Sequence, residues 1–189
     1  MVRSFTADPI DSEQLDALLS YALGGPSAGN ARSLHLVVLL GSATEHYWTA
    51  TLVEAERSRF PWPGLLRAPA LVLAYVEPAA YLARYSEADK AGAGLGEAEI
   101  DWPVPYWWVD GGAAIENLLL GATAHGLGAC LFGQFDHEDA VRIVFGVPDS
   151  MRAVGTIAIG HPDPSDDRSS GSGLRGRADP GEHVHRGAW

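Results

Sequence analysis

The sequence predicts an α+β or α/β domain in which a sheet of about four strands is flanked by helices. The chain has 189 residues, which is enough for one domain with a sizeable hydrophobic core. Hydrophobic residues make up 47% and charged residues 20% of it, the balance of an ordinary globular protein. Apolar runs of strand length alternate with helix-like segments, at residues 34–40, 70–76, 128–132 and 153–160.

The first helix is expected over residues 8–23, where leucine and alanine recur at helical spacing. Asp11 or Ser12 can cap its N-terminus, and a Gly-Gly-Pro sequence ends it. Residues 34–40, LHLVVLL, follow as a strand. Because they are almost continuously apolar, we expect this strand to be buried on both faces of the sheet.

The middle of the chain predicts a second helix, a second strand and a loop. Residues 42–57 suit the helix, and residues 70–76, ALVLAYV, suit a buried strand. A short helix is expected from Pro78 to Tyr85. Residues 86–105 combine charges, glycines and two prolines, so we expect a loop that is either a lid, a dimer-wrapping segment or a plain surface loop.

The second half of the chain begins with a long helix, expected from about Asp110 with the sequence DGGAAIENLLL. Glycine in a helix costs up to about 1 kcal/mol relative to alanine, so the glycines in its first turns predict close packing of another element there. Asp136 is expected to cap a short helix that ends near Phe145.

The last part of the chain differs in composition. Residues 1–160 are predicted to form a single domain, and residues 161–189 a C-terminal arm of the same domain. The arm is polar and rich in Gly, Pro, Asp and Arg. Because it has few apolar residues to bury by itself, it needs another surface to lie on.

The net charge of −11 argues against binding to nucleic acid or to an anionic membrane surface. No apolar run is long enough to span a bilayer, and no signal-peptide pattern is present, so a cytoplasmic location is expected. Lys90 is the only lysine among 13 basic residues. Arginine is favoured where phosphate or carboxylate is bound, and it is equally favoured by a GC-rich genome.

The sequence predicts no metal site and no catalytic nucleophile. Cys130 is the only cysteine, and we expect it to be a small buried residue. His183 and His185 lie in the polar arm without a third or fourth ligand in register. The chain contains no GxSxG, Walker A or HExxH pattern.

Two glycine-bounded segments are candidates for ligand binding. In GGPSAGN, small residues let backbone amides approach a flat or anionic ligand, and Asn30 offers both a donor and an acceptor to a heterocycle. In GACLFGQF, the N–H groups of Gly133 and Gln134 can do the same. On spacing alone, a helix end and a turn is the favoured explanation of each segment, so these residues indicate only that small-molecule binding is feasible.

Four segments together resemble the nitroreductase family of FMN-dependent oxidoreductases over nearly the whole chain. They are VRSFTADPID, GGPSAGNARSLHLVVL, DGGAAIENLLLGATAHGLGACLFGQF and VFGVPDSMRAVGTIAIGHP with a tail ending in VHRGAW. The resemblance implies an α+β fold with a central mixed sheet. It also implies a homodimer in which the C-terminal arm crosses to the partner, with both active sites at the interface.

The resemblance also implies which residues hold FMN. Those against the ring would be Pro26, Ser27, Ala28, Asn30 and Arg32, with Arg32 near the pyrimidine edge. Those on the other side of the ring would be Phe132, Gly133 and Gln134, with a backbone amide near the hydride-accepting nitrogen. Those at the phosphate would be Arg3, Arg175 and Arg177.

An enzyme of this kind leaves the hydride chemistry to FMN, so no side chain is expected to act as a catalytic acid or base. NADH or NADPH would reduce the flavin, and an electron-poor small molecule of the nitroaromatic or quinone type would reoxidise it. Two alternatives stay open. One is a protein that sequesters flavin or deazaflavin without nicotinamide turnover, and the other is a flavin-dependent oxidase of a small substrate.

The sequence departs from the family in two places. The family's Arg-Arg-Ser ahead of Arg3 is absent, so the phosphate grip is weaker, the arm arginines compensate, or translation starts upstream. Residues 86–108 also look unlike the family. Their aromatic side chains either stack on a substrate or belong to the core and dimer contact: Trp102, Tyr106, Trp107 and Trp108.

Overall fold

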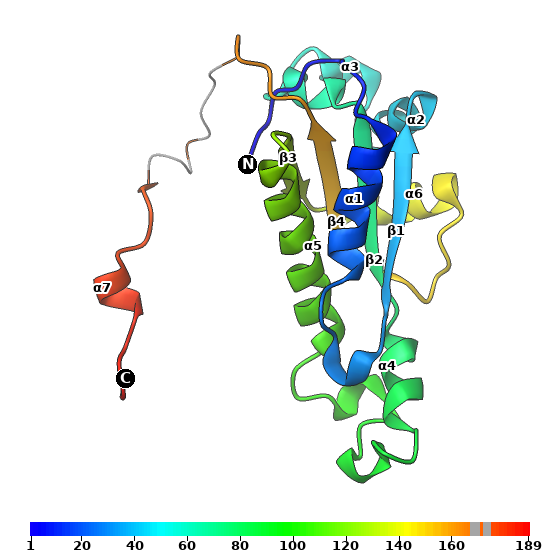
Figure 1. Ribbon diagram of the computed structural model, residues 1–189. Coiled ribbons are helices and arrows are strands. Elements are labelled where there is room, and N and C mark those ends of the chain that lie inside the picture. The colour runs from blue at the N-terminus through cyan, green and yellow to red at the C-terminus, as the bar shows by residue number, and fades with distance from the viewer. Residues whose placement is uncertain (167–170, 172–174) are drawn as a thin grey trace.

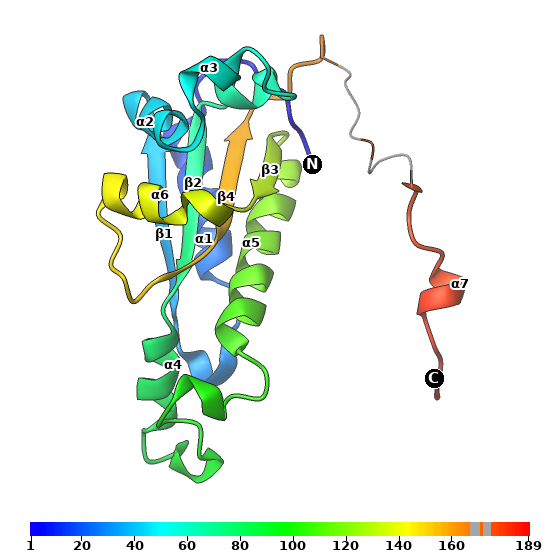
Figure 2. The ribbon, with the colours of Figure 1, turned by 180° about the vertical axis from the view of Figure 1, so that it is seen from behind.

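Residues 1–166, 171 and 175–189 are described in the computed structural model of the chain. A four-stranded sheet lies between two layers of helices (Figure 1). On one face α1 (Ser12–Leu23) packs against α5 (Tyr106–Ala124). On the other face lie α2 (Ser42–Thr51) and α6 (Glu138–Phe145), which Figure 2 shows from behind. The prediction of a sheet of about four strands flanked by helices is therefore confirmed.

The sheet is antiparallel at every described pairing. Its strand order is β1 (Leu34–Leu40), β2 (Ala70–Val76), β4 (Arg152–Gly160) and β3 (Gly128–Phe132). The expectation of a mixed sheet is wrong for the described residues. An apolar run shows where a strand lies but not its direction, and here each connection returns the chain so that neighbouring strands run in opposite directions.

The burial of each strand follows its position in the sheet. Every residue of β2, a central strand, is buried. In β1, only Leu39 is buried. The expectation that residues 34–40 are buried on both faces is wrong because β1 is an edge strand with one neighbour, and the helix layers cover it only in part.

The first helix is capped by Asp11, not Ser12. Its Oδ1 accepts hydrogen bonds from the N–H groups of Glu13 at 3.0 Å and Gln14 at 3.1 Å. The helix expected over residues 42–57 is instead two helices, α2 and the short α3 (Glu54–Arg57). They are separated where the backbone turns extended at the end of α2.

The short helices after β2 and β3 were predicted with different success. Helix α4 (Pro78–Tyr85) has the predicted bounds. The helix before Phe145 does not begin at Asp136, because residues 135–137 form a 3-10 turn and α6 starts at Glu138 without a side-chain cap.

Helix α5 starts one turn earlier than the sequence predicts, at Tyr106 rather than about Asp110. Close packing at its glycines is confirmed for Gly111, where an added Cβ would lie 2.8 Å from a methyl of Val76 and 3.2 Å from one of Val154. Gly112 has no such neighbour. The helix can therefore lie directly on the sheet only along the side that carries Gly111.

The segment between α4 and α5 is ordered around aromatic side chains. Trp102 and Trp107 are buried with Tyr81 in a cluster at the α4 end of the sheet. Tyr106 and Trp108 are exposed. Trp102 and Trp107 are thus core residues, whereas both alternatives remain for Tyr106 and Trp108.

The chain leaves the domain beside its own N-terminus. Asp163 N–H donates to the Ser4 carbonyl at 3.0 Å, and the Asp163 carboxylate pairs with Arg67 at 2.6 Å. Residues 175–189, with the short helix α7 (Pro180–His183), lie apart from the sheet in Figures 1 and 2. Among the described residues no helix combines the length and apolar character needed to cross a membrane.

Candidate flavin site

A cavity of about 470 Å³ lies where α1 ends and β1 begins. The loop between them contributes Pro26, Ser27, Asn30 and Arg32, four of the residues expected at the FMN ring. The far wall comes from α4 and α5, with Tyr81, Asp110, Gly111 and Ala114. The volume is in the range of small-molecule sites.

The loop over residues 26–32 has a strained backbone. Gly29, Asn30 and Arg32 have positive φ angles of 61°, 59° and 55°. For the two residues with a Cβ this conformation costs roughly 1–2 kcal/mol each, less for asparagine than for most. Such strain persists only where surrounding structure holds it, and it clusters at functional sites.

Two neighbouring helices hold this loop. Asp110 Oδ2 accepts hydrogen bonds from the Ala28 N–H and from the Tyr81 hydroxyl, both at 2.7 Å. Arg84 Nε donates to the Gly29 carbonyl at 2.7 Å. Burial, with a smaller effect of Asp110, raises the pKa of Tyr81, so its hydroxyl stays a donor at neutral pH. Sequence reasoning missed Asp110 because it was taken as the start of α5.

Arg32 and Asn30 meet at the mouth of the cavity. Arg32 Nε donates to Asn30 Oδ1 at 3.2 Å, and both side chains are exposed. A guanidinium and an amide are therefore presented together to whatever enters the cavity.

A second cavity of about 340 Å³ lies on the opposite face of the sheet. Arg3, Phe132, Gly133 and Gln134, also expected at FMN, line it. Its walls are aromatic: Trp48 stacks on Phe132 with ring centres 5.9 Å apart. The Arg3 guanidinium lies 5.2 Å from the ring centre of Trp62. The cavity suits a flat ring with a negative or polar edge.

Trp48 contributes its ring, and not its N–H group, to the wall of this cavity. The residue is 4% exposed, and its Nε1 is buried without a hydrogen-bond partner among the described residues. A buried donor without an acceptor costs about 1–3 kcal/mol. Sequence reasoning missed Trp48, which lies in an unremarkable stretch of α2.

The Gln134 side chain is turned away from the cavity into a buried network. Its Oε1 accepts from the Tyr75 hydroxyl at 3.1 Å, and its Nε2 donates to Thr156 Oγ1 at 3.3 Å. Thr156 also bonds the hydroxyl of Tyr47, whose pKa burial raises to about 12. This network anchors the 133–134 turn and engages both polar atoms of the Gln134 side chain.

Cys130 also lines the second cavity, but as a buried thiol. Burial raises its pKa, and the nearby Arg3 charge lowers it by less. The thiol is therefore protonated at neutral pH, which fits the expectation that Cys130 is a packing residue.

The residues predicted at FMN do not form one group within a single chain. The loop between α1 and β1 lies at the α4 end of the sheet, and the N-terminus lies at the other end (Figures 1 and 2). Ala28 faces a third cavity of about 380 Å³, lined also by Tyr85 and Trp102. Arg175 and Arg177 are exposed in the segment apart from the sheet.

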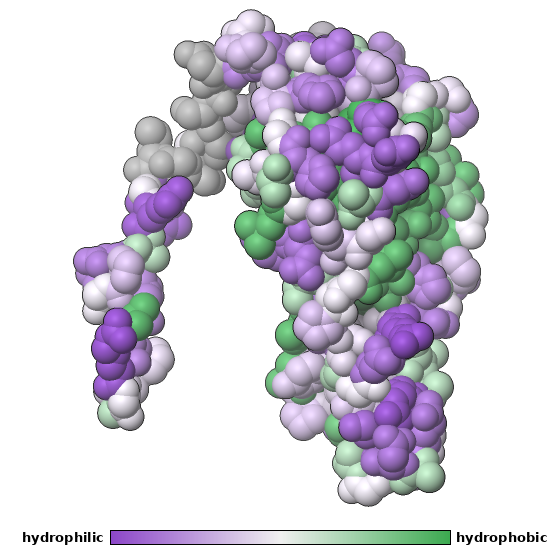
Figure 3. All heavy atoms as spheres, viewed as in Figure 1, coloured by the Kyte–Doolittle hydropathy of each residue, from purple (hydrophilic) through white to green (hydrophobic). Residues whose placement is uncertain are grey.

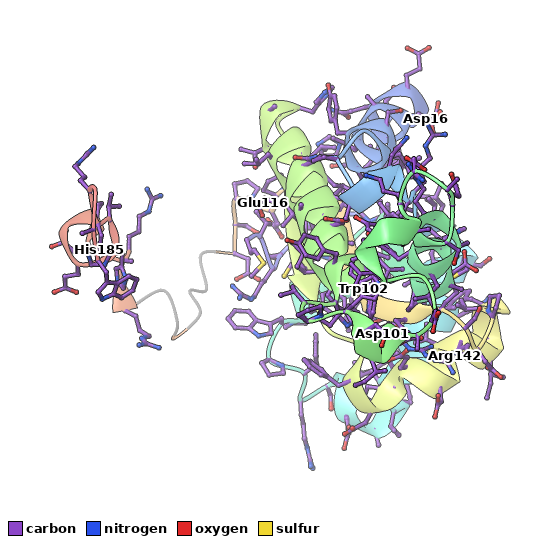
Figure 4. The ribbon with its side chains drawn as sticks, turned by 90° about the horizontal axis from the view of Figure 1, so that it is seen from below. Asp16, Asp101, Trp102, Glu116, Arg142 and His185 are labelled. Atoms are coloured by element: carbon purple, nitrogen blue, oxygen red, sulfur yellow. The ribbon has the colours of Figure 1, made fainter. Side chains whose placement is uncertain are left out.

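The described side chains contain no group of three or more residues placed to hold a metal ion. In the view from below, His185 lies in the segment apart from the domain, far from the labelled carboxylates of α1 and α5 (Figure 4). In that segment the His185 ring stacks on Trp189, with centres 4.3 Å apart.

The fold is a sheet between two helix layers, with a cavity on each side of the sheet and a glycine-bounded, strained loop at one of the cavities. Residues 1–161 match the profile of the nitroreductase family, and the chain belongs to this family.

Two curated relatives are similar over most of the chain. One is a protein of Archaeoglobus fulgidus provisionally named NADH dehydrogenase/NAD(P)H nitroreductase, 23% identical over 100% of this chain and 92% of its own. The other is the 5,6-dimethylbenzimidazole synthase of Rhodospirillum rubrum, 29% identical over 85% of this chain and 77% of its own.

Solved structures share the fold at lower identity. A nitroreductase-like protein of Streptococcus mutans has a TM-score of 0.75 at 16% identity, covering 98% of this chain and 92% of its own. An FMN-dependent nitroreductase of Clostridium difficile has a TM-score of 0.67 at 18% identity, covering 100% of this chain and 94% of its own.

Proposed function

We propose that the protein is an FMN-dependent oxidoreductase that passes a hydride from NADH or NADPH through flavin to an electron-poor small molecule. The proposal is carried by one observation: most of the residues that the family resemblance assigns to FMN line two cavities, the exceptions being Ala28, Arg175 and Arg177. The names of relatives support the chemistry, since one is called FMN-dependent and another an NAD(P)H nitroreductase.

The site is proposed to be complete only in a homodimer. Because the two cavities lie on different faces of one sheet, one ligand can use both only if two copies contribute one cavity each. Exposed apolar side chains on α1 and α5 favour such pairing: Tyr21, Leu23, Trp108, Val109 and Leu120. Figure 3 shows apolar patches that interrupt the polar surface on the face carrying α1 and α5.

FMN, when bound, supplies the ring that accepts and donates the hydride. The protein's part is to bind and orient that ring. The loop with Asn30 offers polar groups to its edge, Arg32 supplies a positive charge there, and the aromatic wall with Trp48 excludes water. Arg3 lies at the mouth of the second cavity, where it can meet the phosphate together with arginines of the arm.

A flavin titration followed by a nicotinamide test checks the proposal. The purified protein is expected to bind FMN with a change in flavin absorbance and fluorescence. Anaerobic mixing with NADH and with NADPH should then bleach the flavin, and a quinone or nitroaromatic compound should restore its colour. A protein that binds no FMN would refute the proposal.

A second candidate function is a flavin-dependent oxidation that uses oxygen and no nicotinamide. The similarity to 5,6-dimethylbenzimidazole synthase favours considering it, because that relative carries a name from outside nitroreductase chemistry. Oxygen uptake with a small substrate, together with a flavin that neither nicotinamide bleaches, would select this candidate. A flavin that stays unreactive in both tests would indicate sequestration.

A further inference from the structure

We propose that Asp110 and Arg84 are positioning residues that hold the loop over residues 26–32 in the shape that binds flavin. Neither belongs to the loop: Asp110 lies on α5 and Arg84 on α4. The inference rests on the proposed function, which gives the loop its ligand, but the loop's dependence on the two residues can be measured without any ligand.

The loop does not fix its own shape. Its internal hydrogen bonds include Asn30 N–H to the Ser27 carbonyl at 2.8 Å and Arg32 N–H to Ser27 Oγ at 3.2 Å. Asn30 and Arg32 nevertheless have positive φ angles, which residues with a Cβ leave when the backbone is free. Contacts from other elements must therefore keep them there.

Asp110 holds the loop from the side of α5. One carboxylate oxygen accepts both the Ala28 N–H and the Tyr81 hydroxyl at 2.7 Å. Tyr81 is completely buried, so its hydroxyl fixes the position of that oxygen. Hydrogen bonds to an ionised acceptor are stronger than neutral ones, which suits a role in holding a strained backbone.

Arg84 holds the next residue from the side of α4. Its Nε donates to the Gly29 carbonyl at 2.7 Å. Its terminal nitrogens bind the Asp89 carboxylate at 2.8 and 2.7 Å and Glu87 at 3.0 Å, so the guanidinium is held in turn. Gly29 has little room to shift, because an added Cβ would lie 3.0 Å from the Tyr85 ring.

The Asp110 and Arg84 hydrogen bonds hold the main chain of Ala28 and Gly29, the two residues directly before Asn30. They therefore set the direction in which the loop presents Asn30 and Arg32 to the cavity. Without them, only a fraction of molecules would hold the binding shape, and the apparent Kd for flavin would rise by the inverse of that fraction. The properties of flavin once bound at saturation would change little, which distinguishes positioning from direct contact.

The test uses the full chain with three variants. Asp110→Ala removes the acceptor, whereas Asp110→Asn keeps the shape of the side chain and one carbonyl oxygen. Arg84→Lys keeps the positive charge but loses the planar guanidinium, which donates to Gly29 and Asp89 at once. Asp149→Ala is the matched control, because Asp149 is an exposed carboxylate between α6 and β4, outside the two helices that hold the loop and outside the helices proposed to pair in the dimer. Two quantities are measured: amide hydrogen exchange of residues 27–33 in the FMN-free protein, and the Kd for FMN.

Asp110→Ala is expected to speed amide exchange in residues 27–33 and to raise the Kd for FMN about tenfold. This is the change expected when the fraction of molecules whose loop has the binding shape falls to about one-tenth. Arg84→Lys should act in the same direction. Asp110→Asn should fall between the wild type and Asp110→Ala, because its oxygen can still accept both hydrogen bonds but no longer carries a charge. Asp149→Ala should change neither quantity, and the spectrum of saturating FMN should be the same in every variant.

Unchanged exchange in Asp110→Ala and Arg84→Lys would overturn the proposal. Faster exchange with an unchanged Kd would also overturn it, because the loop shape would then not matter for flavin. If Asp110→Ala does not fold, Arg84→Lys decides by the same two measurements. A wild-type protein that binds no FMN refutes the proposed function instead, and loop exchange alone then decides whether the two residues hold the loop.

Discussion

At the scale of single residues, the arginines are proposed to meet different parts of the cofactor. Arg32 lies at the mouth of the first cavity beside Asn30. Arg177 is exposed in the segment apart from the sheet, and the proposed dimer would bring it to the phosphate at the partner's site. A charge near the ring favours the reduced flavin, whereas a charge at the phosphate favours both redox states equally.

Replacing each arginine by alanine should therefore have different effects. Arg177→Ala is expected to weaken FMN binding about ten- to a hundredfold, as for the loss of a charge-assisted hydrogen bond, and to leave riboflavin binding unchanged. Arg32→Ala is expected to bind oxidised FMN nearly as well and to lower the reduction potential of the bound flavin. Flavin titrations and potentiometry measure both, and a potential that shifts in Arg177→Ala but not in Arg32→Ala would contradict the assignment.

At the scale of elements, the site depends on where helices begin and end. Helix α1 runs directly into the loop of the first cavity, so its start and end fix one side of that loop. Helix α5 starts a turn before the sequence suggests, and Asp110 therefore lies inside the helix instead of capping it. The start lacks a capping side chain, since Pro105 before it cannot accept a hydrogen bond through its side chain.

The cap of α1 gives a prediction with a neighbouring control. Asp11→Ala is expected to lower the free energy of unfolding by about 1 kcal/mol, because two N–H groups lose their acceptor. Ser12→Ala should have almost no effect, since Ser12 is the first helical residue and not the cap. Urea denaturation of both variants measures the free energy of unfolding. A larger decrease in Ser12→Ala than in Asp11→Ala would show that Asp11 is not the capping residue.

At the scale of the whole molecule, the two cavities and the arm favour a dimer. The first and second cavities share no lining residue, and residues 175–189 make no part of the sheet or its helix layers. A partner copy would supply both the second half of the flavin site and a surface for the arm.

Deleting residues 164–189 tests this arrangement. The cut leaves Asp163 and its contact with Arg67 in place, so the domain edge should stay folded. We expect the shortened protein to lose FMN binding and to dissociate into monomers, measured by flavin titration and sedimentation velocity. A shortened protein that remains dimeric and binds FMN as tightly as the full chain would show that the arm has neither role.

The sequence by itself determined the elements of the fold and the family of the protein. Residues 70–76, 78–85 and 128–132 were predicted with the bounds that the structure has, because their apolar runs and turn residues are local signals. Family motifs are equally local, so the loop with Asn30 could be nominated before any contact was known.

Only the tertiary structure decided strand direction, which donors are left unpaired, and how the strained loop is held. The strand order and the antiparallel directions follow from the connections between strands, and an apolar run in the sequence does not reveal either one. The Asp110 to Ala28 contact spans 82 positions, and the unpartnered state of Trp48 depends on every residue packed around it. Such features are produced by long-range packing, which brings together residues whose own neighbours in sequence give no sign of the contact.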